Sequence, residues 1–377
     1  MAGIYLHIPF CKKACHYCNF HFSTSTRQLP QMVDAIIAEA ELRKHYLNDE
    51  VNTVYFGGGT PSLLSGEQLS LIMRSLRKWY RISADAEISL EANPDDISID
   101  SLDQWREAGI NRLSIGIQSF AGSDLQRMNR AHDAAQSLEA LRLAKECGFS
   151  NITIDLIYGI PGLSDEQWKE NVDTALSFGI PHLSCYALTV EPATALEKMI
   201  AQQKERPTDP DQQARQFGLL TEWLGAAGFE HYEISNFAKP GFRSRHNSSY
   251  WQGSHYLGLG PSAHSFNGLS RQWNIANNAA YIAGILSGIP GFEMETLSER
   301  QRLNEYLMVS LRTMEGISLE ELGRRWGNDK AATVVREAQK HLQRNYLVHT
   351  GGHLQLTAAG KFLADGIAAD LFETGQD

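Results

Sequence analysis

The chain has 377 residues, of which 42% are hydrophobic and 21% are charged, a composition typical of a globular protein. This length allows one large domain and one smaller domain. The formal net charge of −10 disfavours a nucleic-acid-binding surface, so we expect no nucleic-acid partner. No apolar run reaches the roughly 18 residues of a membrane helix, and the first residues lack the pattern of a secretion signal. We therefore expect a cytoplasmic protein without an integral membrane segment.

Three closely spaced cysteines, Cys11, Cys15 and Cys18, follow a short apolar stretch with the spacing C-x3-C-x2-C. Electron-transfer [4Fe–4S] clusters use four thiolates, so three thiolates leave one iron of such a cluster free to bind another ligand. This spacing therefore points to chemistry at an iron atom. The alternative is three unrelated thiols, or a zinc site that lacks one ligand. The histidines that could complete a zinc site are His7, His16 and His21.

The chain alternates short apolar strands with amphipathic helices. The expected strands are residues 4–8, 52–56, 86–91, 112–117, 151–157 and 182–188. The expected helices are residues 30–46, 66–79, 98–108, 134–147 and 166–179. Such alternation implies parallel strands joined by right-handed crossovers. Six strands are too few for a closed eight-stranded barrel, so the expected fold class is α/β without barrel closure.

Polar or glycine-rich residues follow the ends of these strands. Active residues of barrels gather at the C-terminal ends of the strands. Residues 57–60 (GGGT) follow the second strand, and consecutive glycines let the backbone approach a ligand closely. Glu91, Gln118 and Asp155 lie at the ends of later strands, where the alternative is a surface or salt-bridged side chain. Arg130 has the fork geometry that suits a ligand carboxylate, and its alternative is a solvated surface position.

The cysteine spacing and the GGGTP segment at residues 57–61 resemble the radical S-adenosylmethionine (SAM) superfamily. The resemblance implies that the cysteines hold a [4Fe–4S] cluster whose free iron binds SAM. It also implies that the glycine-rich segment contacts the amino group of SAM, and that the six strands form an open (β/α)6 partial barrel. Reduction of the cluster would then cleave SAM to a 5′-deoxyadenosyl radical.

Longer motifs narrow the resemblance, namely YLHIPFC at residues 5–11, EANP at 91–94, SIGIQSF at 114–120 and DLIYGIP at 155–161. Together they are similar to the oxygen-independent coproporphyrinogen III oxidase family, along nearly the whole chain. By this resemblance the cluster ligands are Cys11, Cys15 and Cys18. The SAM-contacting positions that it implies are Tyr5, Gly58, Gly59, Thr60, Glu91, Gln118, Arg130 and Asp155.

Three features separate the chain from the oxidases of that family. The oxidase pattern continues to a fourth cysteine where this chain has Phe20. The oxidases also carry an N-terminal extension, whereas ten residues precede Cys11 here. Residues 246–251 (HNSSYW) match HNxxYW, a motif associated with heme binding in the oxidase-like heme chaperones. These features resemble the chaperone group of the family.

His246 of this motif is the expected heme ligand, because imidazole is a common axial ligand of heme iron. Tyr250 and Trp251 can pack on a porphyrin face. The alternative is a structural role for His246 in closing the open edge of the barrel. The other histidines that remain candidates for the heme ligand are His231, His255 and His264.

Two classes of function follow from these resemblances. A heme chaperone would bind heme and deliver it to client hemoproteins, with a homodimer as one possible arrangement. The alternative is a radical SAM oxidase that decarboxylates coproporphyrinogen III, and a radical SAM enzyme with another substrate is a third option. The sequence leaves open whether the protein is an enzyme.

Three segments are expected along the chain. Residues 1–233 form the radical SAM core, residues 234–297 an irregular connecting segment with the HNxxYW motif, and residues 298–377 a mainly helical, winged-helix-like domain. In the last segment an apolar stripe predicts helices, and Gly351 and Gly352 join two strands of a hairpin. Its mixed charges favour a role in covering the site or binding a protein.

Overall fold

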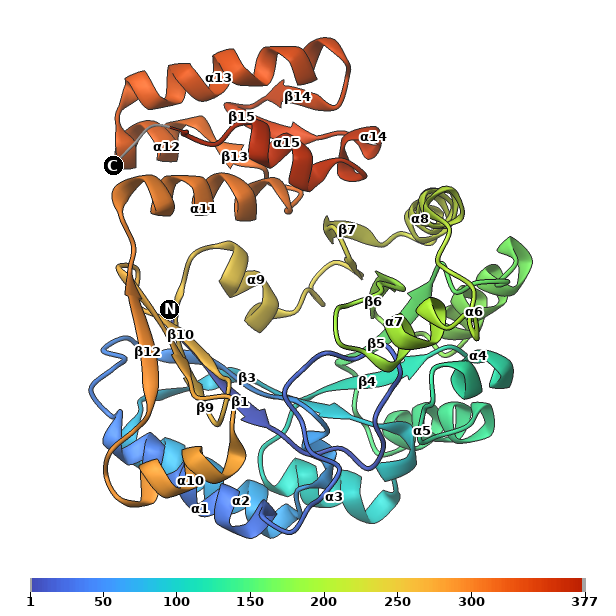
Figure 1. The fold of residues 1–377 in the computed structure, drawn as a ribbon, viewed down its shortest axis with the longest axis vertical. Helices are drawn as coiled ribbons and strands as arrows, with labels where there is room; N and C mark the ends of the chain where they lie inside the picture. Colours follow the sequence, from blue (N-terminus) through green and yellow to red (C-terminus); the bar gives the residue numbers. More distant parts are fainter. Residues whose placement is uncertain (1, 375–377) are drawn as a thin grey trace.

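Six parallel strands form the middle of one large sheet in the computed structural model, which describes residues 2–374 (Figure 1). They are β1 (Ala2–Ile8), β2 (Val51–Gly58), β3 (Ile82–Ala92), β4 (Arg112–Gln118), β5 (Ile152–Tyr158) and β6 (His182–Ala187). Their order in the sheet is their order in the chain. All six predicted strands are confirmed, and within residues 2–374 the two edges of the sheet do not pair with each other, so the barrel is open.

Helices connect these strands and cover the outer face of the sheet (Figure 1). They are α1 (Leu29–Leu42), α2 (Gly66–Trp79), α3 (Ile99–Glu107), α4 (Gly122–Arg127), α5 (Ala134–Glu146) and α6 (Asp165–Ser177), with short 3-10 turns η1 (Pro61–Leu63) and η2 (Pro94–Asp96). Capping boxes at Ser65, Ser98, Asp133 and Ser164 satisfy the first amide groups of four of these helices. The five predicted helices are confirmed, and α4 is additional.

Residues 234–297 were expected to be irregular, and that prediction is wrong. This part of the chain contains β8 (Asn236–Ala238), α9 (Arg245–Trp251), β9 (His255–Leu259), β10 (His264–Phe266), β11 (Ser270–Asn274), α10 (Asn278–Leu286) and β12 (Phe292–Thr296). With β7 (Glu230–Glu233), these strands extend the sheet at both edges to 12 strands, in the order β12-β11-β10-β9-β1-β2-β3-β4-β5-β6-β8-β7. Each added strand has three to five residues, too few for a clear two-residue alternation in the sequence.

The C-terminal part is a separate layer with its own core, above the sheet in Figure 1. It comprises α11 (Glu299–Leu311), β13 (Ile317–Ser318), α12 (Leu319–Trp326), α13 (Asn328–Gln343), β14 (Leu347–Thr350), β15 (His353–Leu356), α14 (Ala358–Lys361) and α15 (Ala364–Asp370). Helices followed by the β14–β15 hairpin give the winged-helix-like arrangement that the sequence predicts. Residues 375–377 of the expected C-terminal segment, and Met1 of the first segment, lie outside the described residues.

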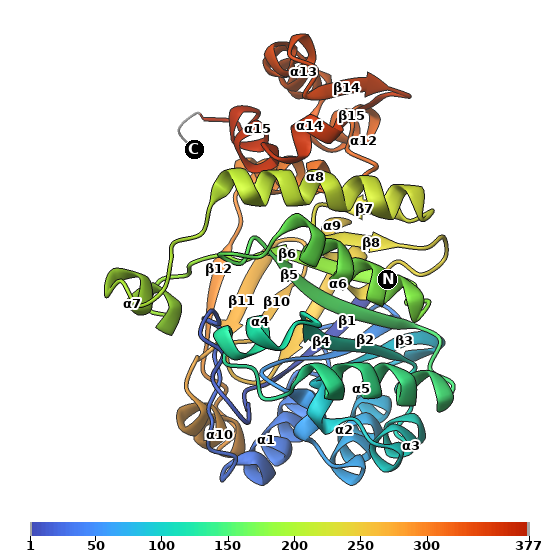
Figure 2. The ribbon, with the colours of Figure 1, turned by 90° about the vertical axis from the view of Figure 1, so that its right-hand side faces the viewer.

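Two more helices, α7 (Ala195–Ala201) and α8 (Pro210–Ala226), complete the core, and α8 lies next to the C-terminal layer (Figure 2). The Phe217 ring on α8 packs edge-on against Phe362, with 4.7 Å between ring centroids. Lys361 Nζ donates to the carbonyl oxygen of His231 at 3.3 Å. None of the helices within residues 2–374 is long and apolar enough to span a membrane.

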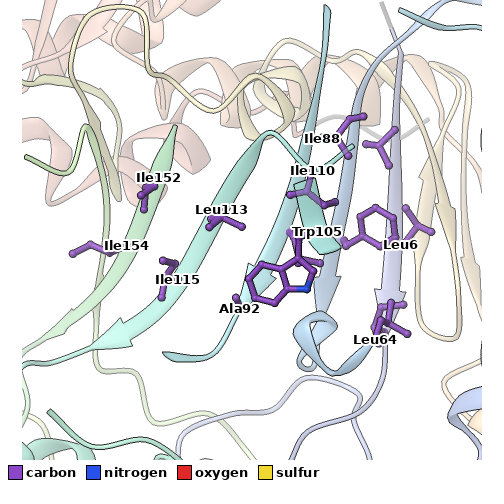
Figure 3. Packing of buried hydrophobic residues seen from close by; sticks show 14 of the residues in the cluster. Leu6, Leu64, Ile88, Ala92, Trp105, Ile110, Leu113, Ile115, Ile152 and Ile154 are labelled. Carbon is purple, nitrogen blue, oxygen red and sulfur yellow. The ribbon is translucent and has the colours of Figure 1, made fainter. Parts of the chain in front are cut away.

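The sheet has an apolar outer face and a polar inner face. Outward-pointing residues such as Leu6, Leu113 and Ile154 are fully buried beneath the helices, where Trp105 fills the space between them (Figure 3). Each such side chain contributes about 1.5–3 kcal/mol of burial free energy. Because side chains alternate along a strand, the intervening polar residues all point to the inner face. This alternation gathers the polar residues that form the candidate site.

Candidate functional site

Glu91 lies near the C-terminal end of β3, on the inner face of the sheet. Its carboxylate accepts a hydrogen bond from Tyr55 Oη at 2.8 Å and one from the Gly58 amide at 3.2 Å. Removal from water raises the pKa of Glu91 to about 8. The hydrogen bond from Tyr55 lowers this pKa, and the nearby Asp155 raises it. The carboxyl group is therefore poised to gain or lose a proton near neutral pH.

Asp155 lies in the middle of β5, and removal from water raises its pKa to about 7. The Arg130 cation lowers this pKa most, and Ser184 and the Arg112 cation also lower it. Glu91 and Asp155 line one internal cavity together with Tyr55 and Arg112. Two carboxyl groups of raised pKa in one polar cavity are typical of a functional site.

The glycine-rich loop passes very close to the first strand. A Cβ atom at Gly58, where φ is +107°, would lie 2.6 Å from Nδ1 of His7. A Cβ atom at Gly59 would lie 2.6 Å from the carbonyl oxygen of Phe10. Thr60 follows, and its amide donates to the same carbonyl at 2.7 Å. Glycine is therefore required for the loop to reach the cysteine segment.

The three cysteines lie on the loop that follows β1. Arg130 Nη1 donates to Cys15 Sγ at 3.2 Å. Burial raises the pKa of Cys11 to about 11. A hydrogen bond with Thr60 lowers this pKa, and the neighbouring Cys18 and Cys15 raise it. The pKa of Cys18 is also raised by burial. Because metal binding requires thiolates, cluster binding at these cysteines would release protons.

Within residues 2–374, no three His, Cys, Asp or Glu side chains converge on a point that one metal ion could occupy. A cubane cluster makes a different demand, because each thiolate binds a different iron atom. The histidines of the zinc alternative are engaged elsewhere: His7 with the His21 carbonyl, His16 with the Arg127 carbonyl and His21 with Asn278. The donor set thus suits a three-thiolate cluster better than a mononuclear site.

Arg130 connects the cysteine loop to the sheet. Its Nη2 donates to Asn93 Oδ1 at 2.8 Å and to the Gly116 carbonyl at 2.9 Å, and its Nη1 also contacts Tyr17 Oη at 3.3 Å. Its Nε is buried and lacks a hydrogen-bond partner among the described residues. An unsatisfied buried donor costs about 1–3 kcal/mol, which a ligand carboxylate would recover.

Gln118 and Tyr5 complete the set of predicted contacts. Gln118 adopts a positive φ of +67° where the β4–β5 register shifts, which turns its side chain towards Gly116 and Arg130. Tyr5 Oη hydrogen-bonds His7 Nδ1 at 3.2 Å, and its ring stacks on Tyr55. Of the eight predicted SAM-contacting positions, Tyr5 and Asp155 lie in the middle of their strands, and the other six lie near the carboxyl ends of strands or in the loops that follow.

His246 lies inside the molecule on α9, with only 1% of its surface exposed. Thr53 Oγ1 hydrogen-bonds its Nδ1 at 2.8 Å, and Tyr250 Oη hydrogen-bonds its Nε2 at 2.9 Å. Its ring stacks on Tyr55 with a centroid distance of 4.9 Å, and burial lowers its pKa to about 3. Glu87 accepts the amide of His246 at 3.0 Å.

The other three histidines differ in exposure. His231 is bonded to the Ile234 carbonyl at 3.0 Å and stacks on Phe237. His255 is exposed and lies 3.6 Å from the Asp49 carboxylate. His264 is exposed at the start of β10. Among the described residues, the hydrogen bonds and ring contacts of His246 are with other side chains, so these three histidines do not form one cluster with it.

The sequence prediction missed several members of the cavity. Tyr55, Arg112, Ser184 and Asn247 line it beside Glu91. The first three lie on strands at positions that share a face with the predicted carboxylates, so two-residue alternation was the signal that could have found them. Asn247 comes from α9, which gave no such signal.

The open sheet and the three-cysteine loop define a protein of the radical SAM class. Residues 5–175 match the Radical SAM superfamily, and residues 297–363 match the HemN C-terminal domain. The chain is 37% identical to the heme chaperone HemW of Mycobacterium tuberculosis, over 98% of this chain and 94% of that protein. It is 33% identical to the heme chaperone HemW of Bacillus subtilis, over 97% of this chain and all of that protein. The chain belongs to the HemW family.

The fold also matches a solved structure of an enzyme. The coproporphyrinogen III oxidase HemN from Escherichia coli superimposes with a TM-score of 0.84 and 25% sequence identity. The match covers 98% of this chain and 90% of the other. The predicted fold class, a partial barrel with a C-terminal winged-helix-like domain, is thereby confirmed.

Proposed function

We propose that this protein is a heme chaperone that binds heme and delivers it to client hemoproteins. The observation that carries the proposal is the similarity over nearly the whole chain to relatives named heme chaperones. Phe20 supports it, because its ring is 65% exposed on the cysteine loop at the position of the fourth oxidase cysteine. A homodimer, a cytoplasmic location and the identity of the clients stay predictions.

The proposal includes a [4Fe–4S] cluster held by Cys11, Cys15 and Cys18. When bound, the cluster supplies the iron atom that chelates SAM and the electron that can cleave it. Around it, the residues proposed to hold SAM are Tyr5, Gly58, Gly59, Thr60, Glu91, Gln118, Arg130 and Asp155. The orphaned Arg130 Nε suits the SAM carboxylate, and the carboxyls of Glu91 and Asp155 suit an ammonium or ribose hydroxyls.

A second candidate is a coproporphyrinogen III oxidase, an enzyme. The structural match with HemN favours it, since it includes the C-terminal layer as well as the barrel. The oxidase would use the same cluster and SAM residues. The two candidates therefore differ in what happens to the tetrapyrrole and not in the cofactor site.

The test uses anaerobically reconstituted full-length protein. Titration with ferric heme, followed by absorbance, measures binding through the Soret band. The same protein is then incubated with coproporphyrinogen III, SAM and dithionite, and the porphyrins are separated after oxidation. Stoichiometric heme binding without decarboxylated product supports the chaperone, whereas turnover to protoporphyrinogen establishes the oxidase instead.

A further inference from the structure

His246 is poorly placed to ligate heme iron. Both ring nitrogens are already hydrogen-bonded, to Thr53 and Tyr250, and the ring is covered by Tyr55. A ligand bond to iron requires a free lone pair on one of these nitrogens. Ligation through Nε2 would therefore break the hydrogen bond with Tyr250, and ligation through Nδ1 would break the one with Thr53 on β2.

His264 has the opposite properties. It is exposed, and neither ring nitrogen makes a hydrogen bond to another residue within 2–374. Burial of part of the ring and the Arg271 cation lower the pKa of His264, which favours the neutral imidazole. A neutral imidazole with a free nitrogen is the form that binds heme iron.

The glycine-rich turn before His264 determines its place in the fold. A Cβ atom at Gly260, where φ is +100°, would fall on the carbonyl oxygen of His7. A Cβ atom at Gly258 would fall on the carbonyl oxygen of His264 itself. The Gly260 turn thus lies against the end of β1, and the start of β10 lies against β9, the neighbour of β1, at the same rim of the sheet as the cysteine loop.

The strand register places His264 on the inner face. Tyr5 pairs with Gly258 and Tyr256 pairs with Phe266, so these residues share one face of the extended sheet. His264 pairs with Trp273, and the two rings lie nearly parallel, 28° apart, with 6.0 Å between their centroids. An exposed imidazole beside an indole is a surface that accepts a flat aromatic ring system.

The HNxxYW motif packs against the aromatic residues of this surface. Tyr250 hydrogen-bonds His246 and packs edge-on against Tyr256, with 4.7 Å between ring centroids. Tyr256 in turn contacts Phe266, which follows His264 by two residues on β10. A continuous series of aromatic contacts thus connects the buried motif to the exposed face.

We propose that heme lies on the inner face of β9–β11 with His264 as the iron ligand, and that His246 positions the aromatic support. This inference rests on the proposed heme-binding function. It assigns the iron-ligating role to an exposed imidazole with a free nitrogen and a positioning role to the buried one. The bound species is iron protoporphyrin, a flat ring system with a metal that takes an axial nitrogen.

The test compares heme binding by the wild-type protein with that of His264→Gly, His246→Ala and His255→Ala. His255→Ala is the matched control, because His255 is an exposed histidine on the neighbouring strand β9. We expect at least a tenfold weaker affinity and a shifted Soret band in His264→Gly, and recovery of the wild-type spectrum on adding imidazole. His255→Ala should match the wild type.

His246→Ala should keep the spectrum of the histidine-ligated complex, even where a loosened α9 lowers affinity. The inference is overturned if His264→Gly binds heme with the wild-type spectrum, or if His246→Ala and not His264→Gly loses the spectrum of the histidine-ligated complex. If the wild-type protein shows no saturable heme binding, the proposed function fails first. Thermal unfolding of each variant shows that the loss is not a loss of the fold.

Discussion

Arg312 and Glu233 form an ion pair that joins the C-terminal helices to the sheet, with 3.1 Å between nitrogen and oxygen. Arg312 ends α11, and Glu233 lies on β7 with only 2% of its side chain exposed. Glu233 also accepts from Asn236 Nδ2 at 2.7 Å, and Ser184 Oγ donates to Asn236 Oδ1 at 2.9 Å. Since Ser184 and Asp155 line the same cavity, polar contacts run from the proposed SAM site to the C-terminal layer.

Arg312→Ala should destabilise the protein by roughly 3 kcal/mol, because it leaves the buried Glu233 carboxylate without its cation. It also removes the guanidinium from the face of the Trp251 ring, 5.3 Å away. Urea unfolding gives the free energy. The matched control is Arg336→Ala, which breaks an exposed pair with Glu337 and should change stability by less than about 1 kcal/mol. Equal effects of the two changes would show that the pair does not hold the layers together.

Stability should fall as the pH rises from about 4.5 to about 8, because the native state keeps a proton on Glu91 that the unfolded state has lost. The contribution has a slope of up to about 1.4 kcal/mol per pH unit. Glu91→Gln removes it, so the variant should lose less stability than the wild type across this range. The measurement is urea unfolding of the SAM-free protein at several pH values.

Asp155 contributes a similar slope up to about pH 7, and it is present in both proteins, so it cancels from the comparison. Glu107→Gln, at an exposed position on α3, is the control and should keep the wild-type slope. A slope unchanged by Glu91→Gln would mean that Glu91 is ionised in the native protein at low pH. SAM affinity should also fall at least tenfold in Glu91→Gln.

Cys15→Ser should abolish cluster assembly, since a three-thiolate site cannot spare a ligand. Reconstituted wild-type protein should carry about four iron atoms per chain, and the variant close to none. Cys147→Ser is the matched control, because Cys147 is a half-buried thiol at the end of α5, away from the cysteine loop. Full iron content in Cys15→Ser would rule out the cluster assignment.

The parts of the fold that could be predicted from the sequence depend on local pattern. The strands β1–β6 are apolar runs, and Glu91 and Asp155 could be recognised because each interrupts such a run. The glycines at 57–59 could be assigned to the end of a strand and the loop after it, and the structure places Gly57 and Gly58 in β2 and Gly59 in the loop. Each of these inferences needs only neighbouring residues.

The remaining features depend on contacts between residues far apart in the chain. The pairing of Tyr5 with Gly258 makes β9 a neighbour of β1, and no local pattern indicates it. Thr53 and His246 meet across 193 residues, so the sequence could not show that both His246 nitrogens are occupied. For the same reason the sequence favours His246 of the HNxxYW motif over the exposed His264 as the heme ligand.

Gly260→Ala tests the turn that brings His264 to the rim. The new Cβ atom would meet the His7 carbonyl, and alanine is also strained at a φ of +100°, so we expect a loss of roughly 3 kcal/mol or more. Gly253→Ala is the control, since φ there is +66° and no atom lies within 4 Å of the new Cβ, which leaves only about 1–2 kcal/mol of backbone strain. Both free energies come from urea unfolding, and heme affinity should fall in Gly260→Ala alone, because only that change displaces the start of β10. Equal heme affinities in the two variants would show that the position of this turn does not determine heme binding.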